Sequence, residues 1–346
     1  MMFKHRIYII FILLALFFSC RKDKPEVVQQ NLISSLGTNS VLVINEGNFM
    51  FSNASLTYIN LSDDEIIEDV FKSVNNQNLG DVLQSVYARN NLYYLIVNNS
   101  SKIEIIDRNS FKFKGTITGL NSPRYMLSVS NNKAYVSDIY DNSIHIIDLN
   151  SASKIGSISI NAWTEQMTYV YGKVFVTAPN RDYLYVINAE KDLIQDSIFI
   201  QKNAYSIVQD KQSNIWVLSS GNSNSGVTPK LYKINPINLS ILNVFEFTLN
   251  DTPGNLKISG FLDTLYFLNK GVWQMPISSD ITNAKKIIEQ SSSNFYGLGI
   301  HPQTHEIFVA DALDYVQKGN VYRHKPNGEL IKSYKVGIIP SDFIFE

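Results

Sequence analysis

The segment AYVSDIYDNSIHIIDL, residues 134–149, contains the pattern that decides the fold. An apolar run leads into a polar, turn-prone patch, and a second apolar run follows that ends near an acid. The same layout occurs upstream in LYYLIVNNSSKIEIID (92–107) and downstream in VFVTAPNRDYLYVIN (174–188). Recurrence at a nearly fixed interval is the signature of a repeat architecture.

The chain carries seven copies of the first apolar run. They begin at residues 41, 92, 134, 174, 215, 265 and 307, and the last six are 40 to 50 residues apart. In the third unit, four short strands are expected at 124–129, 133–138, 143–149 and 154–160, with turn formers between them. This period and strand count predict an all-β, seven-bladed β-propeller of four-stranded antiparallel blades. A helical repeat is disfavoured because no unit shows a 3.6-residue apolar period over ten or more residues.

The two ends of the propeller sequence indicate how the ring closes. The first unit opens at VLVINEG (41–47), which matches the second strand of the other units. The segment VGIIPSDFIFE (336–346) resembles TGLNSPRYMLSV (118–129), which begins the third unit. We therefore expect residues 341–345 to supply the innermost strand of the first blade, closed by the C-terminal strand, which removes a free sheet edge. The propeller is expected to span residues 41–346.

The N-terminal segment indicates secretion and a lipid anchor. A cationic KHR (4–6) precedes twelve apolar residues (7–18), too few to span a bilayer comfortably. The segment ends in LFFSC, which resembles the cleavage box of a bacterial lipoprotein, so residues 1–20 are interpreted as a signal peptide and Cys20 as the lipidation site. Residues 21–40 are expected to form a flexible tether that reaches roughly 25 Å.

Composition narrows the function classes. The 346 residues are 45% hydrophobic with a net charge of −1 and no long basic run, so we expect no nucleic acid partner. Cys20 is the only cysteine, which excludes a disulfide within the chain and a metal site built from several cysteines.

Loop lengths point to one binding face. In a propeller, the loops between strands two and three share a face with the loops between blades. Here these loops are long, as in NEGNFMFSNA (45–54), SGNSNSGVTP (220–229) and DALDYVQKGN (311–320), whereas the turns of the opposite face are short. Rigid scaffolds commonly carry function on such loops. A single asparagine in them can equally be a turn former.

The side chains expected to contact a ligand on this face are Asn48, Phe49, Phe51, Asn78, Asp81, Asn98, Arg124, Tyr125, Asp138, Tyr140, Trp163, Asn180, Tyr205, Asn222, Tyr296, Asp311 and Tyr315.

Catalytic and metal-binding signatures are weak. Near the innermost strands only Asp81, Glu165 and Asp342 are acidic, which is few for a calcium cage. In HPQTH (301–305), the proline and the flanking strands indicate a turn and not a metal-binding helix. His145 lies between two isoleucines of a strand and is interpreted as a core residue. No nucleophile-elbow, P-loop or dinucleotide motif occurs, so we expect no enzyme activity, no cofactor and no metal.

Three stretches carry a resemblance to a known family: VINEGNF (43–49), LGDVLQSV (79–86) and SPRYMLSV (122–129). With the repeat, they resemble the YncE-type β-propeller lipoproteins of Bacteroidetes over residues 41–346, one branch of which is similar to the cell-surface cobalamin-binding protein BtuG. The resemblance implies an outer-membrane lipoprotein, on the cell surface or facing the periplasm. It would capture a small nutrient, with cobalamin or another corrinoid as the first candidate, for a TonB-dependent outer-membrane transporter.

Two alternatives stay open at this point. The ligand face could dock a protein partner without a small molecule, or the propeller could be a metal-dependent hydrolase.

Overall fold

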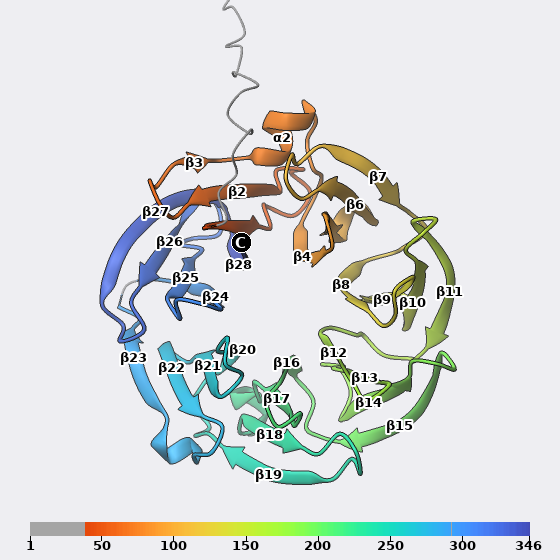
Figure 1. The fold of residues 1–346 in the computed structure, drawn as a ribbon. Coiled ribbons are helices and arrows are strands. Elements are labelled where there is room, and N and C mark those ends of the chain that lie inside the picture. The colour runs from red at the N-terminus through yellow and green to blue at the C-terminus, as the bar shows by residue number, and fades with distance from the viewer. Residues whose placement is uncertain (1–38, 292) are drawn as a thin grey trace, which may run out of the picture. The chain divides into compact units, whose positions relative to one another are not determined.

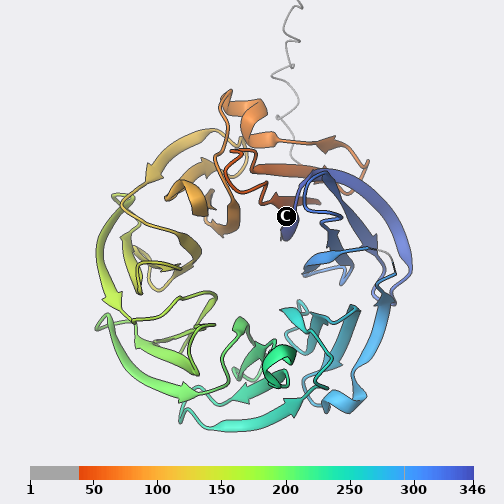
Figure 2. The same cartoon turned by 180° about the vertical axis from the view of Figure 1, so that it is seen from behind.

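Seven four-stranded antiparallel sheets form a ring in the computed structural model, which describes residues 39–291 and 293–346 (Figures 1 and 2). The sheets follow one another around a central channel, and the innermost strand of each lies beside it. The predicted seven-bladed propeller is therefore confirmed. The predicted signal peptide (1–20), Cys20 and all but the last two residues of the tether (21–40) lie outside the described residues.

The blades are numbered in chain order and their strands are given from the axis outward. Blade 1 contains β28 (Pro340–Phe345), β1 (Ser40–Asn45), β2 (Ser55–Asn60) and β3 (Ile66–Ile67). Blade 2 contains β4 (Leu83–Arg89), β5 (Leu92–Val97), β6 (Lys102–Asp107) and β7 (Phe113–Ile117). Blade 3 contains β8 (Pro123–Ser128), β9 (Lys133–Asp138), β10 (Ser143–Asp148) and β11 (Ser153–Ser159). Blade 4 contains β12 (Met167–Val170), β13 (Lys173–Val176), β14 (Tyr183–Asn188) and β15 (Leu193–Phe199).

The remaining blades repeat this order. Blade 5 contains β16 (Ala204–Gln209), β17 (Ile215–Ser219), β18 (Lys230–Ile234) and β19 (Ile241–Glu246). Blade 6 contains β20 (Gly254–Ile258), β21 (Thr264–Leu268), β22 (Gly271–Pro276) and β23 (Lys285–Glu289). Blade 7 contains β24 (Phe295–Ile300), β25 (Ile307–Asp311), β26 (Lys318–His324) and β27 (Leu330–Ile338). The short helices are α2 (Val70–Asn75), η2 (Asn98–Ser100), η3 (Ser223–Ser225) and η4 (Ile281–Asn283).

The core lies between neighbouring blades. Strands β1, β17 and β25 are buried along their whole length because adjacent sheets cover both of their faces. Between blades 3 and 4, for example, Tyr135 and Ile144 belong to one buried cluster with Val174 and Val176. The outermost strands are exposed over much of their length, as in β19, where five of six residues are exposed. Burial on both faces explains why the second strand of each blade is a continuous apolar run in the sequence.

The ring closes through β28. Val43 of β1 pairs with Thr57 on one side and with Phe343 on the other, so the first blade combines both ends of the propeller sequence. The expected closing strand, 341–345, is confirmed with one additional residue at its start. Arg108 of blade 2 then binds the carboxylate of Glu346, with Nη2 to Oε2 at 2.6 Å.

One element was not predicted from the sequence. After the two-residue strand β3, the chain forms helix α2, whose first turn is capped by the Asp69 side chain accepting the N–H of Lys72 at 3.1 Å. The helix ends at Asn76 in a left-handed conformation with φ of 54°. Among residues 39–346 other than 292, no helix is long and apolar enough to cross a membrane.

Candidate binding site at the channel mouth

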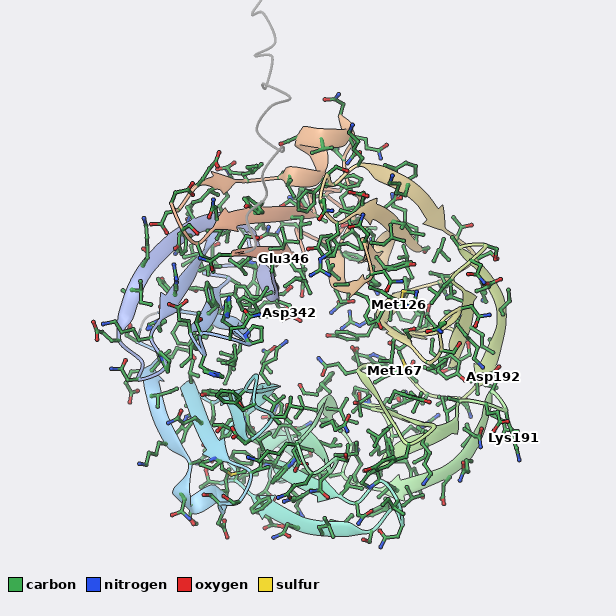
Figure 3. All side chains as sticks on the ribbon, in the orientation of Figure 1. Met126, Met167, Lys191, Asp192, Asp342 and Glu346 are labelled. Carbon is green, nitrogen blue, oxygen red and sulfur yellow. The ribbon has the colours of Figure 1, made fainter. Side chains whose placement is uncertain are left out.

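The innermost strands begin at one end of the channel, which we call the mouth. A cavity of about 380 Å³ opens there and is lined from blades 1 to 4, 6 and 7. Its walls are Glu46, Val82, Gln84, Arg124, Tyr125, Gln166, Thr252, Gly254, Asn255, Leu268, Phe295, Tyr296, Ser341 and Asp342. In Figure 3, the labelled Asp342, Met126 and Met167 lie on the inner part of the ring, whereas Lys191 and Asp192 lie at its periphery. The mouth is therefore a polar cavity built jointly by most of the blades.

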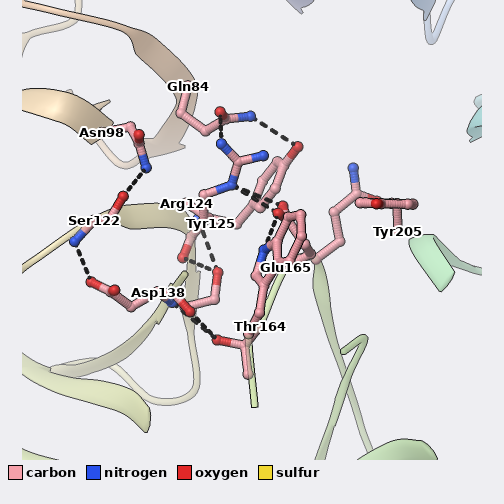
Figure 4. Close-up of polar contacts among 12 residues, drawn as sticks. Gln84, Asn98, Ser122, Arg124, Tyr125, Asp138, Thr164, Glu165 and Tyr205 are labelled. Carbon is pink, nitrogen blue, oxygen red and sulfur yellow. Dashed lines mark hydrogen bonds and ion pairs between the residues drawn. The ribbon is translucent and has the colours of Figure 1, made fainter. Parts of the chain in front are cut away.

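An ion pair between β8 and the segment before β12 organises one wall of the mouth (Figure 4). Arg124 Nε lies 2.9 and 3.0 Å from the two carboxylate oxygens of Glu165. The Glu165 side chain is only 2% exposed, and the Trp163 indole N–H donates to its Oε1 at 2.5 Å. Arg124 Nη1 also donates to Gln84 Oε1. Burial by itself lowers the pKa of the Arg124 guanidinium, but Glu165, Tyr125 and Glu46 together outweigh burial and raise that pKa above its usual value.

A second ion pair joins two innermost strands. Lys257 Nζ of β20 is 2.6 Å from Asp342 Oδ1 of β28, and both side chains are about one-quarter exposed. This pair joins blade 6 to the closing strand of blade 1.

Glu46 also faces the cavity, directly after β1. The Tyr296 hydroxyl donates to its Oε2 at 3.2 Å, and among the described residues it makes no ion pair within 4.0 Å. Burial raises the pKa of Glu46 to about 7, although Arg124 and the hydrogen bonds of Tyr296 and Ser341 to its carboxylate act in the opposite direction. Gly47 fixes the chain at this point: its φ is +76°, and a Cβ there would lie 2.5 Å from Asn53 Oδ1.

The aromatic residues predicted for the ligand face divide into free and packed rings. Phe49, Phe51 and Tyr140 are 62%, 73% and 69% exposed, so their rings are available to a ligand. Trp163 and Tyr205 pack edge-on at 5.8 Å between ring centroids.

Tyr296 and Tyr315 form the second packed pair. Their rings meet edge-on at 5.5 Å between centroids, and Tyr315 remains 42% exposed. The Asn48 side-chain amide donates to the Tyr315 carbonyl at 2.5 Å, which ties the loops of blades 1 and 7 together. Asn48, Tyr296 and Tyr315 are thus brought together beside Glu46.

Asp138 does not reach the cavity, and we reassign it from the ligand set to the loop scaffold. It is fully buried, and its Oδ1 accepts the backbone N–H groups of Tyr140 and Asp141 at 2.9 and 3.1 Å. Its Oδ2 accepts the N–H of Ser122 at 2.7 Å. The carboxylate therefore fixes the β9–β10 loop to the connection that enters blade 3.

Asp311 has the same role in blade 7. It is 1% exposed and accepts the N–H groups of Asn294 and Leu313 at 2.8 and 3.0 Å. Asp81 resembles them in part, since its Oδ2 accepts from Met50 N at 2.7 Å.

The asparagines predicted for the ligand face lie in different places and do not form one site. Asn98 is buried and donates to Ser122 Oγ at 2.9 Å and to the Pro123 carbonyl at 3.0 Å, so it joins blades 2 and 3. Asn180 Oδ1 accepts the backbone N–H of Trp163 at 3.1 Å, and Asn222 caps η3. Asn78 is exposed above a smaller groove beside Phe51. Of the predicted set, Arg124, Tyr125 and Tyr296 line the cavity itself, and sequence reasoning missed Glu46, Gln84 and Asn255 there.

Asp138, Asp141 and His145 form a cluster whose donor atoms lie within 4.8 Å of one another. His145 Nε2 is 3.1 Å from Asp138 Oδ2 and 3.3 Å from Asp141 Oδ2. At the matching register of blade 7, the Tyr322 hydroxyl donates to Asp311 Oδ2 at 3.1 Å. Because a phenol occupies the equivalent place, we interpret His145 as a hydrogen-bonding side chain that holds the loop aspartate.

A larger cavity of about 770 Å³ lies between blades 3 and 4 on the opposite face. Its lysines are already used: Lys133 donates to the Ala189 carbonyl at 2.8 Å and Lys173 to the Pro236 carbonyl at 2.9 Å. The turn of residues 301–305 also lies on this face, as its strand connectivity requires, and the His301 ring accepts two N–H groups of its own turn. The mouth is therefore the stronger candidate site.

Fold and site together define a seven-bladed propeller with a polar cavity at one end of its channel and exposed aromatic rings on the loops of the same face. The chain belongs to the DUF5074 family, a domain of unknown function, whose pattern matches residues 39–346. No curated protein matches the sequence.

Solved structures share the fold at low sequence identity. A quinonprotein alcohol dehydrogenase-like protein from Bacteroides thetaiotaomicron is 14% identical, with a TM-score of 0.72 over 89% of this chain and 78% of that chain. A Bacteroides fragilis protein proposed to be a 6-phosphogluconolactonase is 11% identical, with a TM-score of 0.68 over 89% and 98% of the two chains. A functionally unknown protein from Desulfotomaculum acetoxidans is 11% identical, with a TM-score of 0.67 over 88% and 98%. These likenesses establish the propeller fold.

Proposed function

We propose that this protein binds a small nutrient at the channel mouth and performs no chemistry on it. The observation that carries the proposal is the coincidence, on one face, of a polar cavity with exposed rings on long loops. The cavity offers carboxylate, amide, phenol and guanidinium groups, and Phe49, Phe51 and Tyr140 are exposed on loops of the same face. A few convergent polar groups beside aromatic side chains are typical of small-molecule sites.

The first candidate ligand is cobalamin or a related corrinoid. Such a molecule is a broad, flat disc with an amide fringe and is larger than the 380 Å³ cavity. It would therefore lie across the mouth, with the rings against its apolar surface and one peripheral group entering the cavity. Loops fixed by buried aspartates lose little freedom on binding, which favours affinity.

The proposed setting is the outer membrane. With Cys20 lipidated, the propeller would be tethered on the cell surface or facing the periplasm and would transfer its ligand to a TonB-dependent transporter. Radiolabelled palmitate should label the wild-type protein and leave Cys20→Ser unlabelled. Protease treatment of intact cells would then distinguish the two sides of the membrane.

Calorimetric titration of the folded protein with cyanocobalamin tests the ligand. We expect one binding event per propeller, and Tyr140→Ala should weaken it without changing the melting temperature. Absence of heat with a folded protein would remove the corrinoid. A chelator-sensitive esterase activity would contradict the absence of catalysis and favour the hydrolase.

Protein docking is the second candidate function. Phe49, Met50, Phe51 and Val316 are 62 to 78% exposed on the loops of blades 1 and 7, and exposed apolar groups of this kind occur at protein interfaces. Co-purification with an outer-membrane receptor in the absence of cyanocobalamin, lost in a Phe49→Ser/Phe51→Ser variant, would favour docking.

A further inference from the structure

Among the described residues, Glu46 differs from Glu165 and Asp342 in having no lysine or arginine nitrogen within 4.0 Å, although the charge of Arg124 acts on it from further away. Glu165 is held by Arg124, and Asp342 is held by Lys257. Glu46 receives a hydrogen bond from the Tyr296 hydroxyl and has no ion pair among the described residues. Of the carboxylates of Glu46, Glu165 and Asp342, that of Glu46 is therefore the one available to a ligand.

The charged and titratable groups that line the cavity or lie beside it come from blades 1, 3, 4, 6 and 7. They are Arg124 and Tyr125 of β8, Glu165 before β12, Lys257 of β20, Tyr296 of β24 and Asp342 of β28. With Glu46 ionised, these groups hold three carboxylates and two cations. The cavity then carries one uncompensated negative charge.

The position of Glu46 is fixed before any ligand arrives. Its backbone N–H donates to the Ile339 carbonyl at 2.9 Å, and its own carbonyl accepts from Leu83 N at 3.2 Å. Gly47 holds the next bend. The carboxylate therefore faces the cavity from a rigid segment between β1 and the closing strand, as a pre-organised acceptor should.

We infer that Glu46 recognises the ligand by accepting a hydrogen bond from a nitrogen donor, either a primary carboxamide or an ammonium group, that enters the cavity. The inference rests on the proposed function of this mouth and adds the chemistry of the group that enters it. A carboxylate or phosphate on the ligand is disfavoured beside Glu46 because two anions would share a poorly solvated space. A nitrogen donor on the ligand would give Glu46 a partner of the kind that Glu165 has in Arg124 and Asp342 has in Lys257.

Binding should then depend on pH with a defined sign. Burial raises the pKa of Glu46 to about 7, so the empty protein holds this group mostly protonated at pH 6 and mostly ionised at pH 8. If only the ionised form accepts the donor, the apparent affinity rises about tenfold from pH 6 to pH 8, following the ionised fraction. Binding also releases a proton, which calorimetry in two buffers of different ionisation enthalpy measures.

The first experiment titrates wild type, Glu46→Gln and a control, Glu190→Gln, with cyanocobalamin at pH 6 and pH 8. Glu190 is exposed on the opposite face, so its variant removes the same charge away from the mouth. Wild type and Glu190→Gln should bind about tenfold more tightly at pH 8. Glu46→Gln should bind about tenfold more weakly than wild type at pH 8 and show no dependence on pH. Equal affinity of all three proteins at both pH values overturns the inference and leaves the proposed function standing.

A second experiment is independent of the corrinoid. The side-chain carboxyl resonances of ¹³C-labelled glutamate are titrated with pH, and the Glu46 signal is identified by its loss in Glu46→Gln. Propylammonium chloride and propionamide are added in separate arms, which distinguishes the ammonium from the carboxamide. A lower titration midpoint of Glu46 in either arm supports the inference even if cyanocobalamin does not bind. An unchanged midpoint in both arms overturns it.

Discussion

Replacement of Arg124 by methionine provides the most direct test of the mouth architecture. The change leaves Glu165, 2% exposed, with the Trp163 N–H as its remaining donor. Removing one partner of a buried ion pair costs about 3–5 kcal/mol, because the other charge stays desolvated. For a propeller of this size, that loss corresponds to a drop in melting temperature on the order of 10 °C.

The pH dependence of this loss has a predictable sign. Burial already raises the pKa of Glu165 in the folded wild type, although Arg124 and the Trp163 indole act in the opposite direction, and loss of Arg124 raises that pKa further. A group with a raised folded pKa contributes stability that is present at low pH and lost as pH rises. The deficit of Arg124→Met relative to wild type should therefore be larger at pH 8 than at pH 5.

Urea unfolding followed by circular dichroism at both pH values measures this deficit. The double variant Arg124→Met/Glu165→Gln should recover part of the loss, because the buried charge is gone. A deficit below about 1 kcal/mol at pH 8, or one that is equal at pH 5, would refute the assignment of Arg124 as the counter-ion of a buried glutamate.

Three further predictions concern single residues. Tyr140→Ala should leave the free energy of unfolding unchanged. Trp163→Ala should lower it by about 2–4 kcal/mol, because the buried Glu165 carboxylate loses a hydrogen-bond donor and a packed ring is removed. Thermal melts of both variants test this difference. Asp138→Ala should destabilise the protein by about 2–4 kcal/mol. Neither Zn²⁺ nor a chelator should change the melting temperature of wild type. A rise with Zn²⁺ would show that Asp138, Asp141 and His145 form a metal site. Between pH 5 and pH 8, wild type should lose about 2.5 kcal/mol of stability through Glu46, whose pKa is raised to about 7, and Glu46→Gln should lack that part of the loss in urea unfolding.

The fold could be predicted because apolar strands recur in the sequence at a nearly constant spacing. Strands such as β9 are covered on both faces, so their sequences are continuous apolar runs, and the turns between them contain the residues that turns require. The closing strand was visible because 336–346 repeats the start of a unit. Helix α2 was not visible, since its six residues are too few to show a helical period and only the cap at Asp69 marks it.

The sequence predicted the face of the propeller on which the candidate site lies, but not which side chains line its cavity. Whether a loop aspartate points outward or accepts backbone N–H groups depends on neighbours, and Asp138 takes one of its partners, Ser122, from the preceding connection. Its bond to the N–H two residues later was a usable signal, because short polar side chains commonly form such turns. Glu46 was missed because its hydroxyl partner, Tyr296, lies 250 residues further along the chain.

The pairing of β1 with β28 also has a consequence for biosynthesis. Ser341 reaches back to the Ile44 carbonyl across 297 residues, so the inner edge of β1 has no strand partner until almost the whole propeller has been synthesised. At 5–20 residues per second, this interval lasts about 15–60 s. Throughout it, the nascent chain presents an apolar strand with open hydrogen-bonding groups, which other polypeptides can join. Holdase chaperones that cover this strand during synthesis and export would protect the unfinished ring from aggregation.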